Sequence, residues 1–311
     1  MEYFLGVDGG GSKTLALASD TTGKIIGSGL SPSSNYQSVG FEPAITSLDQ
    51  AISKAGSHLS NYPESIKAIC LGLAGVDRPD EKKLFEDWCR GRFPKAEVHI
   101  VNDGRLVLAA GTPDDWGIAC ISGTGSIVYG VNASGQFERS GGWGYLIGDE
   151  GSGYWIGKEA LRAVVKAYDR RSPKTQLTEL VLQHWNLTHP TQLLKVIYRS
   201  GLNPPDVAHL SILVEQAAEL GDRVSIQILS NAASELCATI KSVCKKLRLY
   251  GNIPCALAGG VLTKGKITAE FLINKCNQSG VLLSPVCLVV EPAKGALRIA
   301  SKSVGYLLEF D

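Results

Sequence analysis

Hydrophobic residues near the start of the chain come in short runs that end in glycine-rich turns. Residues 4–7 and 14–19 are apolar runs of strand length, and the turn "DTTGK" separates the second run from a third at 25–29. Short apolar runs bounded by glycine and small polar residues are typical of buried strands. The pattern predicts a strand, a glycine turn, a strand, a turn and a third strand.

Helix-like spacing of apolar residues then alternates with further strand-like runs. Helical periodicity occupies 43–54 and 81–92, and strand-like runs occupy 66–75 and 97–103. Alternation of this kind favours an α/β fold, in which helices cover a largely parallel sheet.

The hairpin pattern returns in "WGIACISGTGSIVYGVNASGQF", which begins at Trp116. Gly125 and Ser126 lie 114 residues after Gly11 and Ser12, and the turn "NASGQ" falls near the place of "DTTGK". We interpret the chain as two copies of one plan. A chance similarity of two glycine hairpins is the competing interpretation.

The second copy carries a helical insertion before its last two strands. The candidate helices are 154–168, 176–185, 191–198, 207–219 and 223–246, the strands are in 253–262 and 286–292, and a closing helix starts at 293. The predicted fold is α/β, with a first domain at 1–115, a larger domain with the insertion at 116–292, and a terminal helix in 293–311. We expect a cleft between the two domains.

Composition removes several classes of partner. Lys and Arg number 31 against 30 Asp and Glu, and the chain contains no dense basic run, so we expect no nucleic-acid partner. The start "MEYFLGVDGG" lacks a signal-peptide pattern, and no apolar run reaches the roughly 20 residues of a spanning helix. We therefore expect a cytoplasmic protein that does not bind membranes.

Cysteine and histidine show no ligand pattern. The eight cysteines include no C-x-x-C pair and the five histidines have no ligand spacing. Reduced, buried thiols are the expectation for a chain of this kind.

The stretch "VDGGGSKT" fits neither of the two familiar nucleotide loops. Ser12 stands where a Walker A loop requires lysine, Thr14 stands where a dinucleotide loop requires its third glycine, and a strand follows where both need a helix. The remaining functional interpretation is a β-turn-β whose backbone N–H groups approach a phosphate, with Ser12, Lys13 or Thr14 adding donors. Asp8 at the strand end is a candidate Mg²⁺ partner through water. A hairpin without function is the simpler interpretation.

Two further glycine-rich loops favour a phosphate-binding hairpin over a hairpin without function. The loop "SGTGS" occupies the duplicated position, and "LAGGV" places paired glycines where a strand meets a helix. Together the three loops are suited to ATP. The candidate residues are Gly10, Gly11, Ser12, Lys13, Thr14, Gly123, Thr124, Gly125, Gly259 and Gly260.

The order of motifs along the chain is "DGGGSKT", "SSN", "VND", "ISGTGS", "GGWGYLIGDEGSGYWIG" and "LAGGV". This order resembles the N-acetylglucosamine kinase group, related to the BadF/BcrA ATPases, within the actin, heat-shock chaperone and hexokinase superfamily. The resemblance spans nearly the whole chain. It implies two ribonuclease H-like (actin-like ATPase) domains flanking a cleft, a terminal helix that returns to the first domain, ATP and Mg²⁺ as cofactors, and a homodimer.

The resemblance also implies residue roles. Asp103, directly after a strand, would be the general base; it could instead cap the helix beginning at Gly104, and both can hold. Asn35 would contact sugar hydroxyls, although a turn residue is the simpler interpretation of a polar loop. The remaining candidates for sugar contact are Gly142, Trp143, Gly144 and Asp149. Trp143 could instead fill a domain core, Asp149 or Glu150 could cap a helix, and Lys13 could face solvent.

The predicted function is ATP- and Mg²⁺-dependent phosphorylation of a small-molecule amino sugar, with N-acetylglucosamine giving its 6-phosphate. The loop "NYQSVG" lacks the tryptophan or long polar segment of some acetylamino-sugar kinases, so glucosamine, N-acetylmuramic acid and other hexoses stay open as acceptors.

Two functions besides a sugar kinase also stay open. One is an ATPase that activates a dehydratase or reductase, and the second is a non-catalytic sugar sensor. The activator would hold an Fe–S cluster with cysteines, which are not clustered along this chain.

Overall fold

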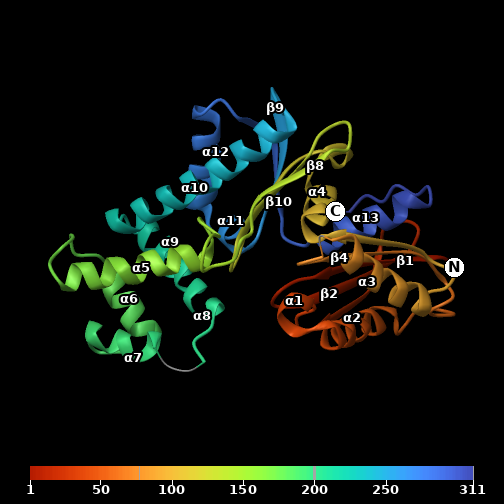
Figure 1. Ribbon diagram of the computed structural model, residues 1–311, viewed down its shortest axis with the longest axis horizontal. Coiled ribbons are helices and arrows are strands. Elements are labelled where there is room, and N and C mark those ends of the chain that lie inside the picture. The colour runs from red at the N-terminus through yellow and green to blue at the C-terminus, as the bar shows by residue number, and fades with distance from the viewer. Residues whose placement is uncertain (77, 199–200, 311) are drawn as a thin grey trace. The chain divides into compact units, whose positions relative to one another are not determined.

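The structure is a computed structural model that describes residues 1–76, 78–198 and 201–310. The chain forms two compact units (Figure 1). The first comprises Met1–Asp115 together with Glu291–Asp311, and the second comprises Trp116–Val290.

The first unit is built on a five-stranded sheet in the order β3-β2-β1-β4-β5. Its strands are β1 (Tyr3–Gly9), β2 (Thr14–Ser19), β3 (Ile25–Ser31), β4 (Ile66–Leu73) and β5 (Glu97–Asn102). β1, β2 and β3 form an antiparallel meander, while β4 pairs in parallel with β1 and β5 in parallel with β4. Each strand covers a predicted apolar run.

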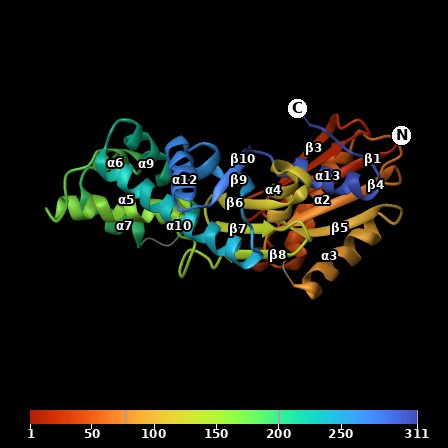
Figure 2. The same ribbon diagram turned by 90° about the horizontal axis from the view of Figure 1, so that it is seen from above.

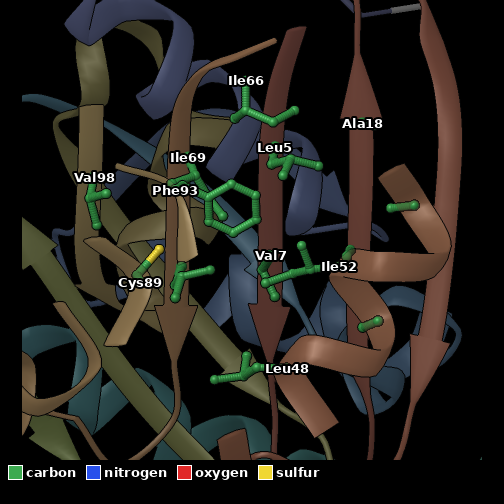
Figure 3. Packing of buried hydrophobic residues seen from close by; sticks show 14 of the residues in the cluster. Leu5, Val7, Ala18, Leu48, Ile52, Ile66, Ile69, Cys89, Phe93 and Val98 are labelled. Atoms are coloured by element: carbon green, nitrogen blue, oxygen red, sulfur yellow. The ribbon is translucent and has the colours of Figure 1, made fainter. Parts of the chain in front are cut away.

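Helices cover both faces of this sheet. They are α1 (Tyr36–Val39), α2 (Phe41–Gly56), α3 (Pro79–Arg92), α4 (Asp103–Gly111) and α13 (Ala293–Ser303), with a 3₁₀ turn at Pro113–Asp115. On one face, Leu48 and Ile52 of α2 pack beside Val7 and Ala18 of the sheet (Figure 3). Burial of such apolar area is the main favourable contribution to folding.

The terminal helix α13 packs on the opposite face of the same sheet. Leu297 is fully buried against Phe4 of β1, and Figure 1 shows α13 beside β1 and β4. An added Cβ at Gly6 would lie 2.6 Å from the Leu297 backbone nitrogen. The absence of a side chain at Gly6 therefore lets helix and strand approach closely.

The second unit repeats the strand order of the first. Its sheet has the order β10-β9-β6-β7-β8, in which β6 occupies the place of β1. The strands are β6 (Gly117–Ser122), β7 (Ser126–Val131), β8 (Phe137–Gly141), β9 (Asn252–Ala258) and β10 (Leu282–Val289). The repeated topology confirms the interpretation of two copies of one plan and the α/β fold class.

The two hairpin loops differ in length. The strand ends pair as Gly9 with Thr14 in the first hairpin and as Ser122 with Ser126 in the second. The loops are therefore residues 10–13 and 123–125. The spacing of 114 holds for the starts of β1 and β6, whereas β2 and β7 start 112 residues apart.

The helices of the second unit form two groups. They are α5 (Gly153–Tyr168), α6 (Leu177–His184), α7 (Leu193–Ile197), α8 (Pro204–Ala208), α9 (Leu210–Glu219), α10 (Arg223–Leu247), α11 (Gly260–Thr263) and α12 (Lys266–Gln278), with a 3₁₀ turn at Pro190–Gln192. α10 and α12 bury apolar residues against the sheet. The inserted helices α5, α6 and α9 lie together around a second core, to which α10 also contributes (Figure 2).

The cysteines are free thiols, and all but one are buried. Cys287 on β10 is exposed, which differs from the expectation of buried thiols. None of the helices in the described part of the chain has the length and apolar content needed to cross a membrane.

Candidate active site

The first hairpin loop presents an exposed tip. The Gly10 backbone N–H donates to the Lys13 carbonyl at 3.0 Å, which closes the turn, and Gly11, Ser12 and Lys13 are exposed. An added Cβ at Gly9 would lie 2.5 Å from Ser34 Oγ. The base of the hairpin is therefore packed tightly, while its tip is accessible to a ligand.

Thr14 has a different environment from its neighbours in the motif. Its side chain is fully buried, and its hydroxyl makes hydrogen bonds of 2.8 Å with the Pro32 carbonyl and with Ser34 Oγ. The expectation that this hydroxyl adds a phosphate donor is corrected accordingly, because it holds residues 32–34 against the hairpin. Ser12 and Lys13 keep exposed side chains, as expected for Lys13.

Asp8 and Asp103 bring two carboxyl groups together in the first unit. Burial and, to a lesser degree, the negative charge of Asp103 raise the pKa of Asp8 from its ordinary value to about 7, while the Lys13 ammonium opposes both. Asp8 is in the last part of β1, and Asp103 directly follows β5. A cation near both groups would offset their repulsion, which suits a metal-assisted reaction.

Asp103 is the first residue of α4 and not its N-cap. Asn102 caps the helix, since its Oδ1 accepts from the Gly104 N–H at 2.8 Å. The interpretation of Asp103 as the cap is therefore wrong, although Asp103 Oδ1 also accepts from this N–H at 2.9 Å. Asn102 is buried, whereas Asp103 is only partly buried.

Asn35 is the N-cap of the short helix α1. Its Oδ1 accepts from the Gln37 N–H at 3.2 Å. Its Nδ2 lies on the side of the hairpin loop, 3.9 Å from the position of an added Cβ at Gly11. The cap thus fixes the amide so that its nitrogen, a donor group, faces the exposed loop.

The second hairpin loop is held by the start of α5. The N–H groups of Gly153 and Tyr154 donate to the carbonyls of Gly123 and Thr124 at 2.8 and 3.3 Å. Ser152 Oγ caps α5 by accepting from the Trp155 N–H at 3.1 Å. Capping by Asp149 or Glu150 is therefore wrong.

Asp149 joins the glycine-rich segment 142–149 to this loop. Its side chain is buried, Oδ1 accepts from the Gly144 N–H at 3.2 Å, and an added Cβ at Gly125 would lie 2.6 Å from Oδ2. Burial raises the pKa of Asp149, while hydrogen bonds from the Gly144 and Ser126 backbone lower it. The carboxyl group thus has defined partners within its own unit.

Trp143 is excluded from the core of the second unit. The residue is 67% exposed, and the Arg139 guanidinium lies 5.3 Å from its ring centroid. Gly142 and Gly144 have φ values of 72° and 88°, a backbone conformation that favours glycine. These glycines allow the turn that presents the indole at the surface.

Gly259 connects β9 to α11, and Gly260 is the first residue of α11. Gly259 has φ 85°, and an added Cβ there would lie 2.2 Å from the Ser122 carbonyl oxygen. An added Cβ at Gly260 would have no atom within 4 Å. The third loop therefore packs closely on the second hairpin through Gly259, while Gly260 offers backbone that a flat ligand can approach.

Comparison with known proteins decides the family. A model of the BadF/BadG/BcrA/BcrD ATPase family matches residues 5–300. The chain belongs to this family. The family assignment confirms the resemblance of the motif order.

Two curated relatives are similar over most of the chain. The N-acetylmuramic acid/N-acetylglucosamine kinase of Clostridium acetobutylicum is 40% identical over 263 residues, covering 84% of this chain and 86% of that protein. The N-acetyl-D-glucosamine kinase of Dictyostelium discoideum is 36% identical over 317 residues, covering 97% and 98%.

Solved structures share the fold. A Chromobacterium violaceum protein assigned as an N-acetylglucosamine kinase is 27% identical, with a TM-score of 0.74 over 96% of this chain and 98% of that chain. A ROK family glucokinase from Streptomyces griseus, solved with glucose and AMPPNP, has a TM-score of 0.62 at 18% identity over 96% and 99%. The actin-like sugar kinase fold is thereby confirmed.

The side chains available as metal ligands decide whether the protein could hold Mg²⁺. The described residues contain no group of three or more His, Cys, Asp or Glu side chains suited to hold a metal ion. Mg²⁺ in phosphoryl-transfer sites is held by one or two carboxylates, waters and substrate phosphates. Asp8 and Asp103 fit that requirement, since each supplies a carboxyl group and the charge of Asp103 acts on Asp8.

Proposed function

We propose that the protein is an ATP-dependent kinase that phosphorylates an amino sugar, with N-acetylglucosamine as acceptor and its 6-phosphate as product. The observation that carries the proposal is the carboxyl pair of Asp8 and Asp103 at strand ends of the first unit. Kinases named for N-acetylglucosamine, similar over most of the chain, support it.

In this proposal the reaction is an in-line displacement at the γ-phosphorus. The sugar hydroxyl oxygen forms a bond to phosphorus, the bond from phosphorus to the ADP oxygen breaks, and the hydroxyl proton passes to the Asp103 carboxylate. Bound Mg²⁺ would neutralise charge on the phosphates, with Asp8 holding it through water. A cation near Asp8 and Asp103 would stabilise the ionised form of the Asp8 carboxyl group, whose pKa burial and Asp103 raise.

The glycine loops would hold ATP. In the first unit, the candidates for phosphate contact are the loop residues Gly10, Gly11, Ser12 and Lys13. The Thr14 hydroxyl supports this loop through its hydrogen bond to the Pro32 carbonyl. In the second unit, Gly123, Thr124 and Gly125 are candidates for phosphate, and Gly259 and Gly260 for adenosine. Backbone N–H groups in tight glycine turns suit phosphate oxygens because no side chain keeps the anion away.

The candidates for sugar contact are an amide in the first unit, and a carboxyl group and an indole in the second unit. Asn35 would donate through Nδ2, because its Oδ1 already accepts from the backbone. Asp149 would accept from sugar hydroxyls in addition to its backbone partners, and the exposed Trp143 between Gly142 and Gly144 would offer an apolar face.

N-acetylmuramic acid is the second candidate acceptor. The relative from Clostridium acetobutylicum is named for both acetylated sugars, and both carry the same acetamido group.

We also propose a cytoplasmic location, where ATP is supplied, and a homodimer, which light scattering would test.

Replacing the proposed base separates a kinase from a sugar sensor. We expect Asp103→Asn to lower turnover by about 10²–10⁴-fold, the usual contribution of a general base, while the dissociation constant for the sugar changes little. Turnover would be followed as ADP release and sugar binding by calorimetry. Unchanged turnover in Asp103→Asn would contradict the role of Asp103.

A further inference from the structure

Glu81, in the first turn of α3, accepts hydrogen bonds from α1 and from the residue that precedes α3. Its side chain is only 8% exposed. Oε1 accepts from the Tyr36 hydroxyl and from Gln37 Nε2, the latter at 3.1 Å, and Oε2 accepts from the Arg78 N–H at 3.0 Å. A buried carboxylate requires such donors, because removing an ionised carboxylate from water without hydrogen-bond partners costs far more than burying a neutral polar group.

The donors from Tyr36 and Gln37 belong to α1, the helix that Asn35 caps. A helix of 4 residues cannot hold its conformation alone, since nucleation costs more than so few hydrogen bonds return. Gln37 Nε2 adds a contact to the Gly75 carbonyl at 3.3 Å. The conformation of α1 therefore depends on partners outside it, and two of its side chains, Tyr36 and Gln37, donate to the same carboxylate of Glu81.

Tyr36 is suited to act as a permanent donor. Burial, together with the Glu81 carboxylate, raises the pKa of Tyr36 to about 12, so the hydroxyl keeps its proton at neutral pH. The ring packs edge-on against Phe85 with centroids 5.8 Å apart. Removing the hydroxyl would thus leave the apolar packing of the ring in place.

The amide of Asn35 depends on this arrangement. Its Oδ1 is engaged by the Gln37 N–H, so its orientation follows the position of α1, and its Nδ2 is on the side of the hairpin loop. We propose that Glu81 is a positioning residue for the acceptor sugar, which acts through Tyr36 and Gln37 to fix the Asn35 amide. This inference rests on the proposed function.

Steady-state kinetics of Tyr36→Phe and Glu81→Gln test the proposal. We expect the KM for the sugar to rise about tenfold, in line with the loss of one or two hydrogen bonds at about 1.4 kcal/mol per factor of ten, with kcat and the KM for ATP within about twofold. Tyr62→Phe is the matched control. It removes another partly buried tyrosine hydroxyl of the first unit, one that accepts from Arg92 at 3.3 Å.

A double-mutant cycle with Asn35→Ala identifies the route. If Glu81 acts through Asn35, Glu81→Gln has little further effect on the sugar KM in the Asn35→Ala background. Additive effects, or a sugar KM no higher than that of Tyr62→Phe, would overturn the role of Glu81. Wild-type protein that phosphorylates no amino sugar would instead overturn the proposed function itself, so the two failures are distinct. Tyr36→Phe keeps the test valid if Glu81→Gln does not fold.

Discussion

The carboxyl groups of Asp8 and Asp103 lie near enough for the negative charge of Asp103 to raise the pKa of Asp8. The strands that carry or precede them, β1 and β5, both pair with β4 in parallel, which brings their carboxyl ends to one edge of the sheet. Two carboxyl groups in such proximity favour a bound cation over two bare charges. The first unit thus combines a candidate base and a candidate metal partner.

The raised pKa of Asp8 predicts a pH-dependent effect of Asp8→Asn on stability. Between its ordinary value of 3.8 and about 7, the folded protein holds this proton more tightly than the unfolded chain, so the wild type loses stability as pH rises through this window. We expect Asp8→Asn to have a free energy of unfolding about 1–3 kcal/mol above that of the wild type at pH 8, with little difference at pH 4.

Urea unfolding at both pH values measures this difference. A stabilisation that is larger at pH 4 than at pH 8 would contradict the assigned environment of Asp8. Mg²⁺ should be omitted from these samples, because a bound cation would itself favour the ionised carboxylate.

The proposed metal role of Asp8 predicts a shifted Mg²⁺ requirement. Removal of Mg²⁺ by a chelator should stop ADP release, and Asp8→Asn should raise the Mg²⁺ concentration for half-maximal activity by about 10–100-fold, as for residues that hold a metal through a bound water. Asp87→Asn is the control, since Asp87 is an exposed carboxylate on α3 that pairs with Lys83. Equal Mg²⁺ curves for the wild type and both variants would argue against Asp8 as a metal partner.

The third loop predicts opposite outcomes for adjacent glycines. Gly259→Ala would place a Cβ 2.2 Å from the Ser122 carbonyl oxygen at φ 85°, so we expect a loss of about 2–4 kcal/mol in unfolding free energy and weaker ATP binding. Gly260→Ala meets open space and should change stability by less than about 1 kcal/mol. Thermal unfolding with and without ATP compares the two, and equal melting temperatures would contradict the close packing of this loop.

The strands and most helices could be predicted because their apolar runs are distinct. The run at 14–19 coincides with β2, and the terminal helix from 293 coincides with the start of α13. Both elements bury a continuous apolar face, which leaves a clear period in the sequence.

Some elements could not be predicted because their buried positions carry weak signals. The sequence predicts no helix for Lys266–Gln278, where the buried residues of α12 include Thr268, Ala269 and Cys276 beside a single leucine. Small and polar residues at core positions produce little hydrophobic periodicity. The sequence does not predict α1, because a helix of 4 residues is too short to show a hydrophobic periodicity.

Local roles of polar residues depend on contacts that no spacing reveals. The sequence identifies Asp103 but not Asn102 as the cap of α4, and it does not distinguish the buried Thr14 hydroxyl from the exposed Ser12. Glu81 has no sequence signal, because its partner Tyr36 is 45 residues away along the chain. Three-dimensional proximity, and not residue type, assigns such side chains.

The central claim, that the protein transfers phosphate from ATP to an amino sugar, is tested most directly by the mass of the product. Purified protein would be incubated with ATP, Mg²⁺ and hexoses with and without a 2-acetamido group, and ADP and sugar phosphate would be measured together. The account predicts sugar-dependent ADP release with an equal amount of phosphorylated N-acetylglucosamine. ADP release without a sugar phosphate, or sugar binding without ADP release, would contradict it.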